Sequence, residues 1–114
     1  MAFTEIELKQ IENVVGKMCK RRSPEQFHDE LRLVYEVRGH DVIVCEERPR
    51  WDDPKQLSSL PVAKFKYTRK DSDWKLYWMR RDLKWHLYEM PKSTKTIEAL
   101  VKEVDKDPHG AFFG

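Results

Sequence analysis

Alternation of apolar and polar side chains over residues 62–88 constrains the fold of this chain more than any other feature. In each of three consecutive runs, alternate residues are apolar, while the residues between them are largely basic or aromatic. Because neighbouring side chains of a β-strand point to opposite faces, this period of two predicts three strands. Turn-forming residues separate the runs at Asp71–Asp73 and Arg81–Asp82, so we expect antiparallel neighbours.

The same alternation predicts two different faces for the sheet. We expect helices to cover the face that carries Leu31, Leu33, Tyr35, Phe65, Trp74, Trp78 and Trp85. In the last run, Trp85 and Leu87 would be core residues. His86 and Tyr88 would lie on the uncovered face, which would then be basic and aromatic.

Two helix-start signals stand in the first quarter of the chain. Thr4–Glu7 is a capping box, which predicts a helix from Glu5 with one apolar stripe. The stripe consists of Ile6, Ile11, Val14, Val15, Met18 and Cys19. The basic residues within 17–22 are expected to stabilise the C-terminal end of the helix dipole, and we favour this role over a contact with a phosphate. Ser23–Gln26 then predicts a short second helix that ends near Glu30.

The rest of the chain supplies two more strands and a closing helix. Alternation over residues 31–38 and an apolar run within residues 41–48 predict a hairpin, with Gly39–His40 as its two-residue turn. Residues 49–61 contain three prolines and are expected to form an irregular loop. A last amphipathic helix is marked by apolar residues at helical spacing, namely Ile97, Leu100, Val101 and Val104.

These elements predict an α+β fold in a single domain that spans residues 1–114. Its order is an N-terminal helix, a short second helix, a five-stranded antiparallel meander sheet and a C-terminal helix packed on one sheet face. Short reversals between neighbouring strands favour the meander.

Charge is distributed unevenly along the chain. The net charge is only +2, although 37% of the residues are charged. Residues 62–84 nevertheless carry eight lysines and arginines against three aspartates. Attraction to nucleic acid would therefore come from this stretch rather than from the protein as a whole.

The sequence contains no pattern typical of a cofactor site, a metal site or membrane insertion. Cys19 and Cys45 are too few for a disulfide framework, and the four histidines lie at no zinc-ligand spacing from them. The N-terminus lacks a signal-peptide pattern, and no apolar run is long enough to cross a membrane. We therefore expect a cytoplasmic protein with buried thiols and no bound cofactor.

Several short motifs are spread over nearly the whole chain. They are Phe3–Glu5, Gly39–Val42, Arg48–Pro49 with Trp51, Val62–Phe65, Leu76–Trp78, Asp82–His86 with Tyr88, and Phe112–Gly114. In these motifs the chain resembles a small bacterial family known only as a domain of unknown function. The resemblance implies one uncharacterised bacterial domain, and no catalytic or ligand-binding residue follows from it.

We interpret the protein as a non-catalytic binding module whose basic and aromatic sheet face contacts nucleic acid or another polyanion. Lysines and arginines would hold phosphates, and aromatic rings would stack on unpaired bases. The predicted binding residues are Lys64, Lys66, Lys75, Tyr77, Arg81, Lys84, His86 and Tyr88, with Arg48 and Trp51 at the rim. In a simpler interpretation, the same face carries a solvated lattice of cross-strand ion pairs and binds no ligand. Its members would be Glu36, Glu46 and Glu47 with Lys64, Lys66 or Arg48.

A homodimeric adaptor or structural protein is a second possible function. Aromatic side chains and arginines are typical of contact surfaces between proteins. An apolar outer patch of Val34, Val42 and Val44 would favour this function. The Phe112–Phe113 tail could also serve as a contact, although docking into the core is its expected position.

A metal-free enzyme that cleaves phosphodiesters is a third possible function. His86 would act as a general acid or base, with Tyr77, Tyr88 and Lys84 on the same face. A lone histidine on a strand is usually a surface or structural residue, so an enzyme is the least favoured of the three.

Overall fold

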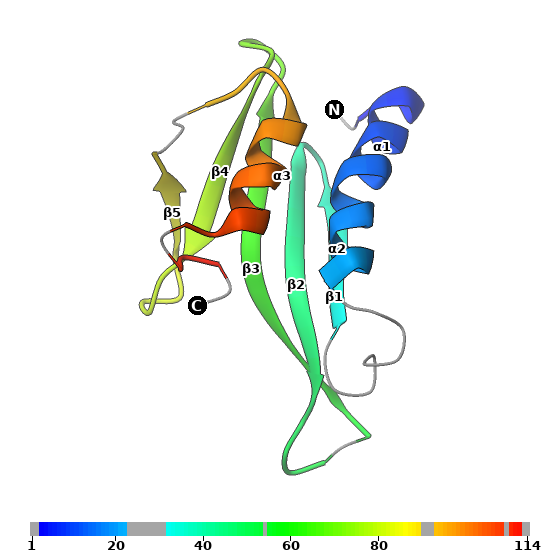
Figure 1. Cartoon of the computed structure of the whole chain (residues 1–114), viewed down its shortest axis with the longest axis vertical. Helices are drawn as coiled ribbons and strands as arrows, with labels where there is room; N and C mark the ends of the chain where they lie inside the picture. Colours follow the sequence, from blue (N-terminus) through cyan, green and yellow to red (C-terminus); the bar gives the residue numbers. More distant parts are fainter. Residues whose placement is uncertain (1–2, 23–31, 54, 90–92, 109, 113–114) are drawn as a thin grey trace.

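The computed structural model describes residues 3–22, 32–53, 55–89, 93–108 and 110–112. Five strands form one antiparallel sheet in the order β1-β2-β3-β4-β5. They are β1 (Arg32–Arg38), β2 (Asp41–Pro49), β3 (Leu57–Thr68), β4 (Asp73–Met79) and β5 (Trp85–Tyr88). Helical segments precede and follow the sheet in the chain, and both lie on one sheet face (Figure 1). The predicted α+β fold with an antiparallel meander is confirmed.

The N-terminal helical run consists of α1 (Glu5–Ile11), a π-helical segment η1 (Glu12–Gly16) and α2 (Lys17–Arg22). The predicted capping box is present, because the Thr4 amide donates to Glu7 Oε1 (2.8 Å) and the Glu7 amide donates to Thr4 Oγ1 (3.2 Å).

Two predictions about this part of the chain have different outcomes. Ile6 is 81% exposed, so its place in the apolar stripe is wrong. Ile6 precedes Ile11 by five residues, which is out of step with the repeat of 3.6 residues that sets one helix face. The predicted second helix falls in residues 23–31, outside the described part of the chain.

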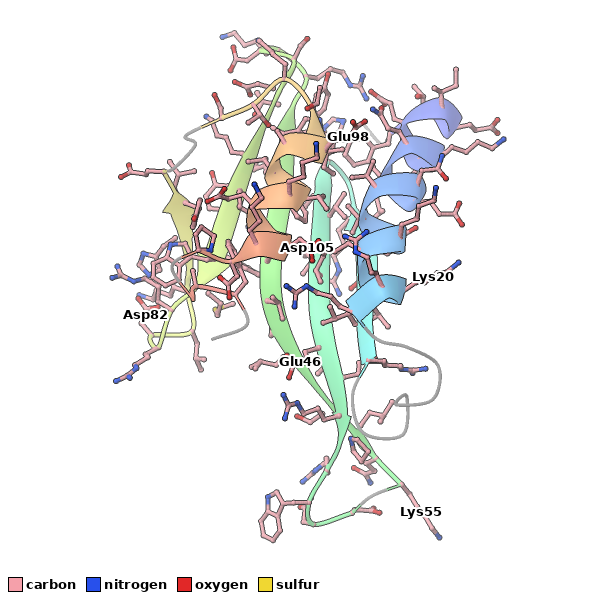
Figure 2. All side chains as sticks on the ribbon, viewed as in Figure 1. Lys20, Glu46, Lys55, Asp82, Glu98 and Asp105 are labelled. Atoms are coloured by element: carbon pink, nitrogen blue, oxygen red, sulfur yellow. The ribbon has the colours of Figure 1, made fainter. Side chains whose placement is uncertain are left out.

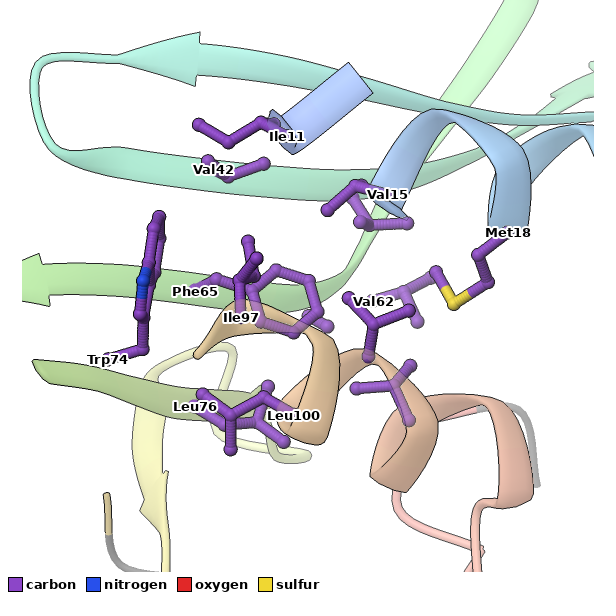
Figure 3. Packing of buried hydrophobic residues seen from close by; sticks show 14 of the residues in the cluster. Ile11, Val15, Met18, Val42, Val62, Phe65, Trp74, Leu76, Ile97 and Leu100 are labelled. Atoms are coloured by element: carbon purple, nitrogen blue, oxygen red, sulfur yellow. The ribbon is translucent and has the colours of Figure 1, made fainter. Parts of the chain in front are cut away.

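The helical run and α3 (Ile97–Lys106) pack apolar side chains onto one side of the sheet, called the covered face from here on. The largest fully buried side chains are Phe65, Ile11, Met18, Leu76, Ile97, Leu100, Val15, Val42, Val44 and Val104. Figure 3 shows members of this core from the helical run, the sheet and α3 side by side. Among the helices that the structure describes, none is long and apolar enough to span a bilayer.

The hairpin between β1 and β2 closes as predicted. Gly39–His40 is a two-residue turn, and Gly39 has a φ of +58°, a conformation that glycine adopts without strain. Next to this turn, the Phe3 ring stacks on Trp74 (5.6 Å between centroids) and contacts the His40 ring edge to face (5.3 Å). These contacts tie the start of the chain to the sheet.

β5 joins the sheet with its two faces opposite to those predicted. Tyr88 lies across from the fully buried Leu76 and is itself only 6% exposed. His86 shares this covered face. Trp85 and Leu87 therefore lie on the uncovered side, and the prediction that they are core residues is wrong.

The connection between β4 and β5 explains this difference. It is a longer reversal than a two-residue turn, with Leu83 at a φ of +61° and its amide donating to the Arg80 carbonyl (2.9 Å). A difference of one residue in such a connection turns every side chain of the following strand to the other face.

β2 and β3 extend past the other strands as a two-stranded projecting ribbon, residues 48–60 (Figure 1). Residues 57–61, predicted to be irregular, are the first residues of β3. Pro61 does not end the strand, because β4 pairs with β3 only from Ala63 onward and Pro61 needs no amide on that edge.

Candidate binding face

The side of the sheet that faces away from the helices is called the open face here (Figure 1). Its side chains alternate with the buried ones along each strand. They include Val34, Glu36, Ile43, Cys45, Lys64, Lys66, Lys75, Tyr77, Met79, Trp85 and Leu87. The open face thus combines three lysines with several apolar and aromatic side chains.

Four predicted binding residues lie together on the open face, where Lys66 is directly opposite Lys75 and Lys64 is directly opposite Tyr77. Asp41 flanks Lys66 on β2. Among the described residues, none of these three lysines forms a salt bridge. Because like charges directly opposite each other destabilise a sheet, this part of β3 and β4 favours a negatively charged ligand.

Acidic residues of β1 and β2 pair with arginines rather than with these lysines. The pairs are Arg32–Glu47 (2.7 Å), Arg38–Glu36 (2.8 Å) and Arg48–Glu46 (2.5 Å). Arg48 and Glu46, two members of the lattice predicted as the simpler interpretation, do pair, but they lie on the same strand, β2, and not on neighbouring strands as predicted. Lys64 and Lys66, its other predicted basic members, take no part in these pairs.

Lys64 extends over two aromatic rings of the open face. Its Nζ lies 5.1 Å from the ring centroid of Tyr77 and 5.3 Å from that of Trp85. Both distances are short enough for cation–π attraction. Trp85 therefore supplies the second aromatic ring of the open face, a role that the sequence suggested for Tyr88.

Tyr88 and His86 lie on the covered face. Tyr88 Oη donates a hydrogen bond to Glu103 Oε1 (2.7 Å), and the Tyr88 ring packs against Phe112 (5.3 Å between centroids). Burial, followed by the hydrogen bond to Glu103, raises the pKa of Tyr88 to about 12. His86 Nε2 is hydrogen bonded to Asp82 Oδ2 (2.8 Å), and this contact lowers the pKa of Asp82. Neither predicted residue is available on the open face.

The remaining predicted residues lie apart from the three lysines. Arg81 and Lys84 are exposed in the connection between β4 and β5, at one end of the sheet. Arg48 and Trp51 belong to the projecting ribbon, where the Trp51 side chain is 95% exposed. In Figure 2 the ribbon tip near Lys55 lies far from the connection that contains Asp82.

The apolar patch that would favour an adaptor does not form as predicted. Val42 and Val44 are fully buried on the covered face, because alternation along β2 turns Ile43 and Cys45 outward instead. Val34 does lie on the open face. In the tail, Phe112 is 8% exposed and docks into the core as predicted, while residue 113 is outside the described part of the chain.

The residues predicted for an enzyme site are not assembled on one face. His86 and Tyr88 lie on the covered face, whereas Tyr77 lies on the open face. Within the described residues, no group of three or more His, Cys, Asp or Glu side chains could hold a metal ion.

A second basic surface lies on the helical side of the sheet. A groove of about 730 Å³ runs between the helical run and β1, with Lys9, Lys17, Lys20 and Arg32 among its lining residues. Arg21 and Arg22, from the same basic cluster, instead hold Asp105 of α3 (2.7 and 2.8 Å). Their role in the described structure is therefore to join two helices.

The two cysteines are free thiols in different environments. Cys19 is buried among core residues, and this burial raises the pKa of its thiol to about 11. Cys45 is half-buried on the open face, and partial burial raises its pKa as well. The prediction of buried thiols is confirmed for Cys19 and only partly for Cys45.

Comparisons with known proteins locate the chain in a family. Neither the curated proteins nor the solved structures contain a match for it. A family model matches residues 3–114, nearly the whole chain, in agreement with the resemblance of its short motifs. The protein therefore belongs to the family described as Domain of unknown function (DUF3024).

Proposed function

We propose that this protein is a non-catalytic binding module that holds an extended polyanion, with nucleic acid as the first candidate, on the open face. The observation that carries this proposal is the group of Lys64, Lys66 and Lys75 on adjacent strands, which forms no salt bridge among the described residues.

Electrostatics supports a polyanion over a neutral ligand. Lys66 and Lys75 are directly opposite each other, so their repulsion is relieved when a phosphate lies between them. Each phosphate that a lysine neutralises also releases a condensed counterion from the nucleic acid. Three lysines predict that the logarithm of affinity falls with the logarithm of salt concentration with a slope of roughly −2 for single strands.

Charge reversal of two lysines tests the proposal. We expect the double variant Lys66→Glu with Lys75→Glu to lose measurable binding to labelled DNA, RNA and heparin at moderate salt, with little change in melting temperature. The matched control is Lys17→Glu with Lys20→Glu, which changes the net charge equally but on the groove beside β1. The control should bind within about threefold of the unaltered protein, because its charges lie on the other side of the sheet and are screened.

Fluorescence anisotropy at two salt concentrations measures the affinity of both variants for the labelled ligands. Equal loss of binding in the two variants would indicate attraction by net charge alone and would contradict a site on the open face. Full binding by the variant with Glu at positions 66 and 75 would contradict it as well.

A second candidate function is a structural protein that docks on another copy of this chain through the projecting ribbon. Trp51, Leu57 and Leu60 are 95%, 50% and 55% exposed on this ribbon. An isolated two-stranded ribbon is only marginally stable in water, so apolar side chains on it favour a contact with a second subunit. The mass of the protein in solution tests this function.

A further inference from the structure

We infer that the polyanion held on the open face is a single-stranded nucleic acid, whose bases stack on Tyr77 and Trp85 when Lys64 leaves these rings for a phosphate. The inference rests on the proposed function and adds the class of ligand and the order of contacts. Lys64 would then be a displaceable cover of the stacking surface.

The arrangement of the three side chains carries the inference. Tyr77 of β4 and Trp85 of β5 are half-buried neighbours on the open face, and Lys64 comes from β3 on the other side of β4. One ammonium group lies 5.1 Å from the first ring centroid and 5.3 Å from the second. One face of each ring is thus occupied by the Lys64 ammonium group, and that face becomes available to a base when Lys64 moves away.

Competition between two kinds of contact favours release of Lys64. A cation–π contact near the surface is weaker than the stacking of a nucleic-acid base on an aromatic side chain. A phosphate of the same strand offers the ammonium a charged partner, so each group gains a better contact when the strand binds. The Lys64 side chain is flexible enough to move from the rings to the phosphate.

The surroundings of the rings favour unpaired bases over other polyanions. Met79 and Leu87 lie beside the two rings on the open face and enlarge the apolar surface that a base can contact. Lys66 and Lys75 lie next in register and supply phosphate contacts along the strand. Bases in a duplex are already stacked, and polyphosphate and heparin have no bases, so none of these three ligands can stack on the rings.

Substitution of the two aromatic rings tests how much stacking contributes to affinity, independently of the contribution of charge. We expect Tyr77→Leu and Trp85→Leu each to lower the affinity for a labelled oligodeoxythymidine of about ten nucleotides roughly tenfold, with the salt slope unchanged. Both variants should bind polyphosphate as the unaltered protein does. Lys64→Met, which keeps the apolar stem, should reduce the salt slope by about 1. The matched aromatic control is Trp51→Leu on the projecting ribbon, where the oligonucleotide affinity should stay the same.

A measurement on the unaltered protein covers the case in which a ring variant does not fold. Stacking of a base on Trp85 should quench tryptophan fluorescence when oligodeoxythymidine binds, whereas polyphosphate should not quench it. The Trp51→Leu variant should show the same quenching.

The outcomes distinguish this inference from the proposed function. Equal affinity for oligodeoxythymidine, duplex and polyphosphate, without quenching, would overturn the inference but would still support a polyanion site on the open face. Tenfold or greater preference for the single strand, lost in the ring variants or accompanied by quenching, would support it. Absence of binding to all three ligands would overturn both.

Discussion

Tyr88 lies on the covered face, opposite to the predicted side, and there it connects β5 to the C-terminal part of the chain. Its ring packs on Phe112, and its hydroxyl donates to Glu103 of α3 at 2.7 Å. Burial and the neighbouring carboxylate both disfavour the phenolate, which raises the pKa from 10 to about 12. Tyr88 therefore fastens β5 to the C-terminal helix and tail.

Replacement of Tyr88 by Phe should reduce the free energy of unfolding by about 1 kcal/mol at neutral pH, because a partly buried hydrogen bond is lost. The folded pKa lies above the unfolded value, so the contribution of the hydroxyl is complete below pH 10 and disappears as the pH rises through about 12. Urea unfolding of both proteins at pH 7 and at several values from pH 10 to 12 measures the difference. A difference that grows with pH would contradict this role.

At the scale of elements, the helical run and α3 are joined by one carboxylate. Asp105 of α3 accepts hydrogen bonds from Arg21 (2.7 Å) and Arg22 (2.8 Å) at the end of α2. Burial by itself raises the pKa of Asp105, but the hydrogen bonds from Arg22 and Arg21 outweigh it and lower the pKa. The two helices on the covered face are thus linked by charge as well as by apolar packing.

Asp105→Asn should lower the free energy of unfolding by about 1 kcal/mol at pH 7, since this partly exposed pair is screened by water. The contribution of the carboxylate is present above its unfolded pKa and is lost as the pH falls through the lower folded value. Chemical unfolding at pH 7 and at about pH 3 compares the two proteins. Glu98→Gln, at an exposed position in the first turn of α3, is the control and should change stability by less than about 0.5 kcal/mol. Equal losses for both substitutions would argue against the link.

At the scale of the whole molecule, two surfaces are left without a partner in the described chain. The open face lies on one side of the sheet, and the projecting ribbon lengthens the molecule, which measures 45 × 31 × 24 Å. Because these surfaces are separate, docking through the ribbon would leave the open face accessible. A polyanion site and a subunit contact can therefore be tested independently.

If the projecting ribbon docks on a second copy, light scattering should give a dimer mass for the unaltered protein and a monomer mass for Trp51→Ala. The reason is that the 95% exposed indole is the largest apolar group on the ribbon. Leu83→Ala, at a 76% exposed position in the connection between β4 and β5, is the control and should keep the dimer mass. A monomer mass at every concentration of the unaltered protein would rule out the ribbon contact.

Much of the fold followed from the sequence alone because its signals are local. The capping box at Thr4–Glu7, the glycine turn at Gly39–His40 and the alternation over residues 62–79 depend on neighbouring residues, and the structure contains all three. The same alternation put Lys64, Lys66, Lys75 and Tyr77 on one face. The family followed from short motifs spread over the chain.

Tertiary structure alone decided which side chains of β5 point to the covered face, and therefore which residues make up the open face. A period of two is a property of one strand, whereas the register between strands depends on the length of the connection and on which side chains the core accepts. Tyr88 packs against Phe112 and donates to Glu103 on the covered face. Because side chains alternate along β5, Trp85 then lies on the open face, where Lys64 contacts its ring. The sequence by itself determined which segments become strands, and packing determined which side of the last strand lies on the open face.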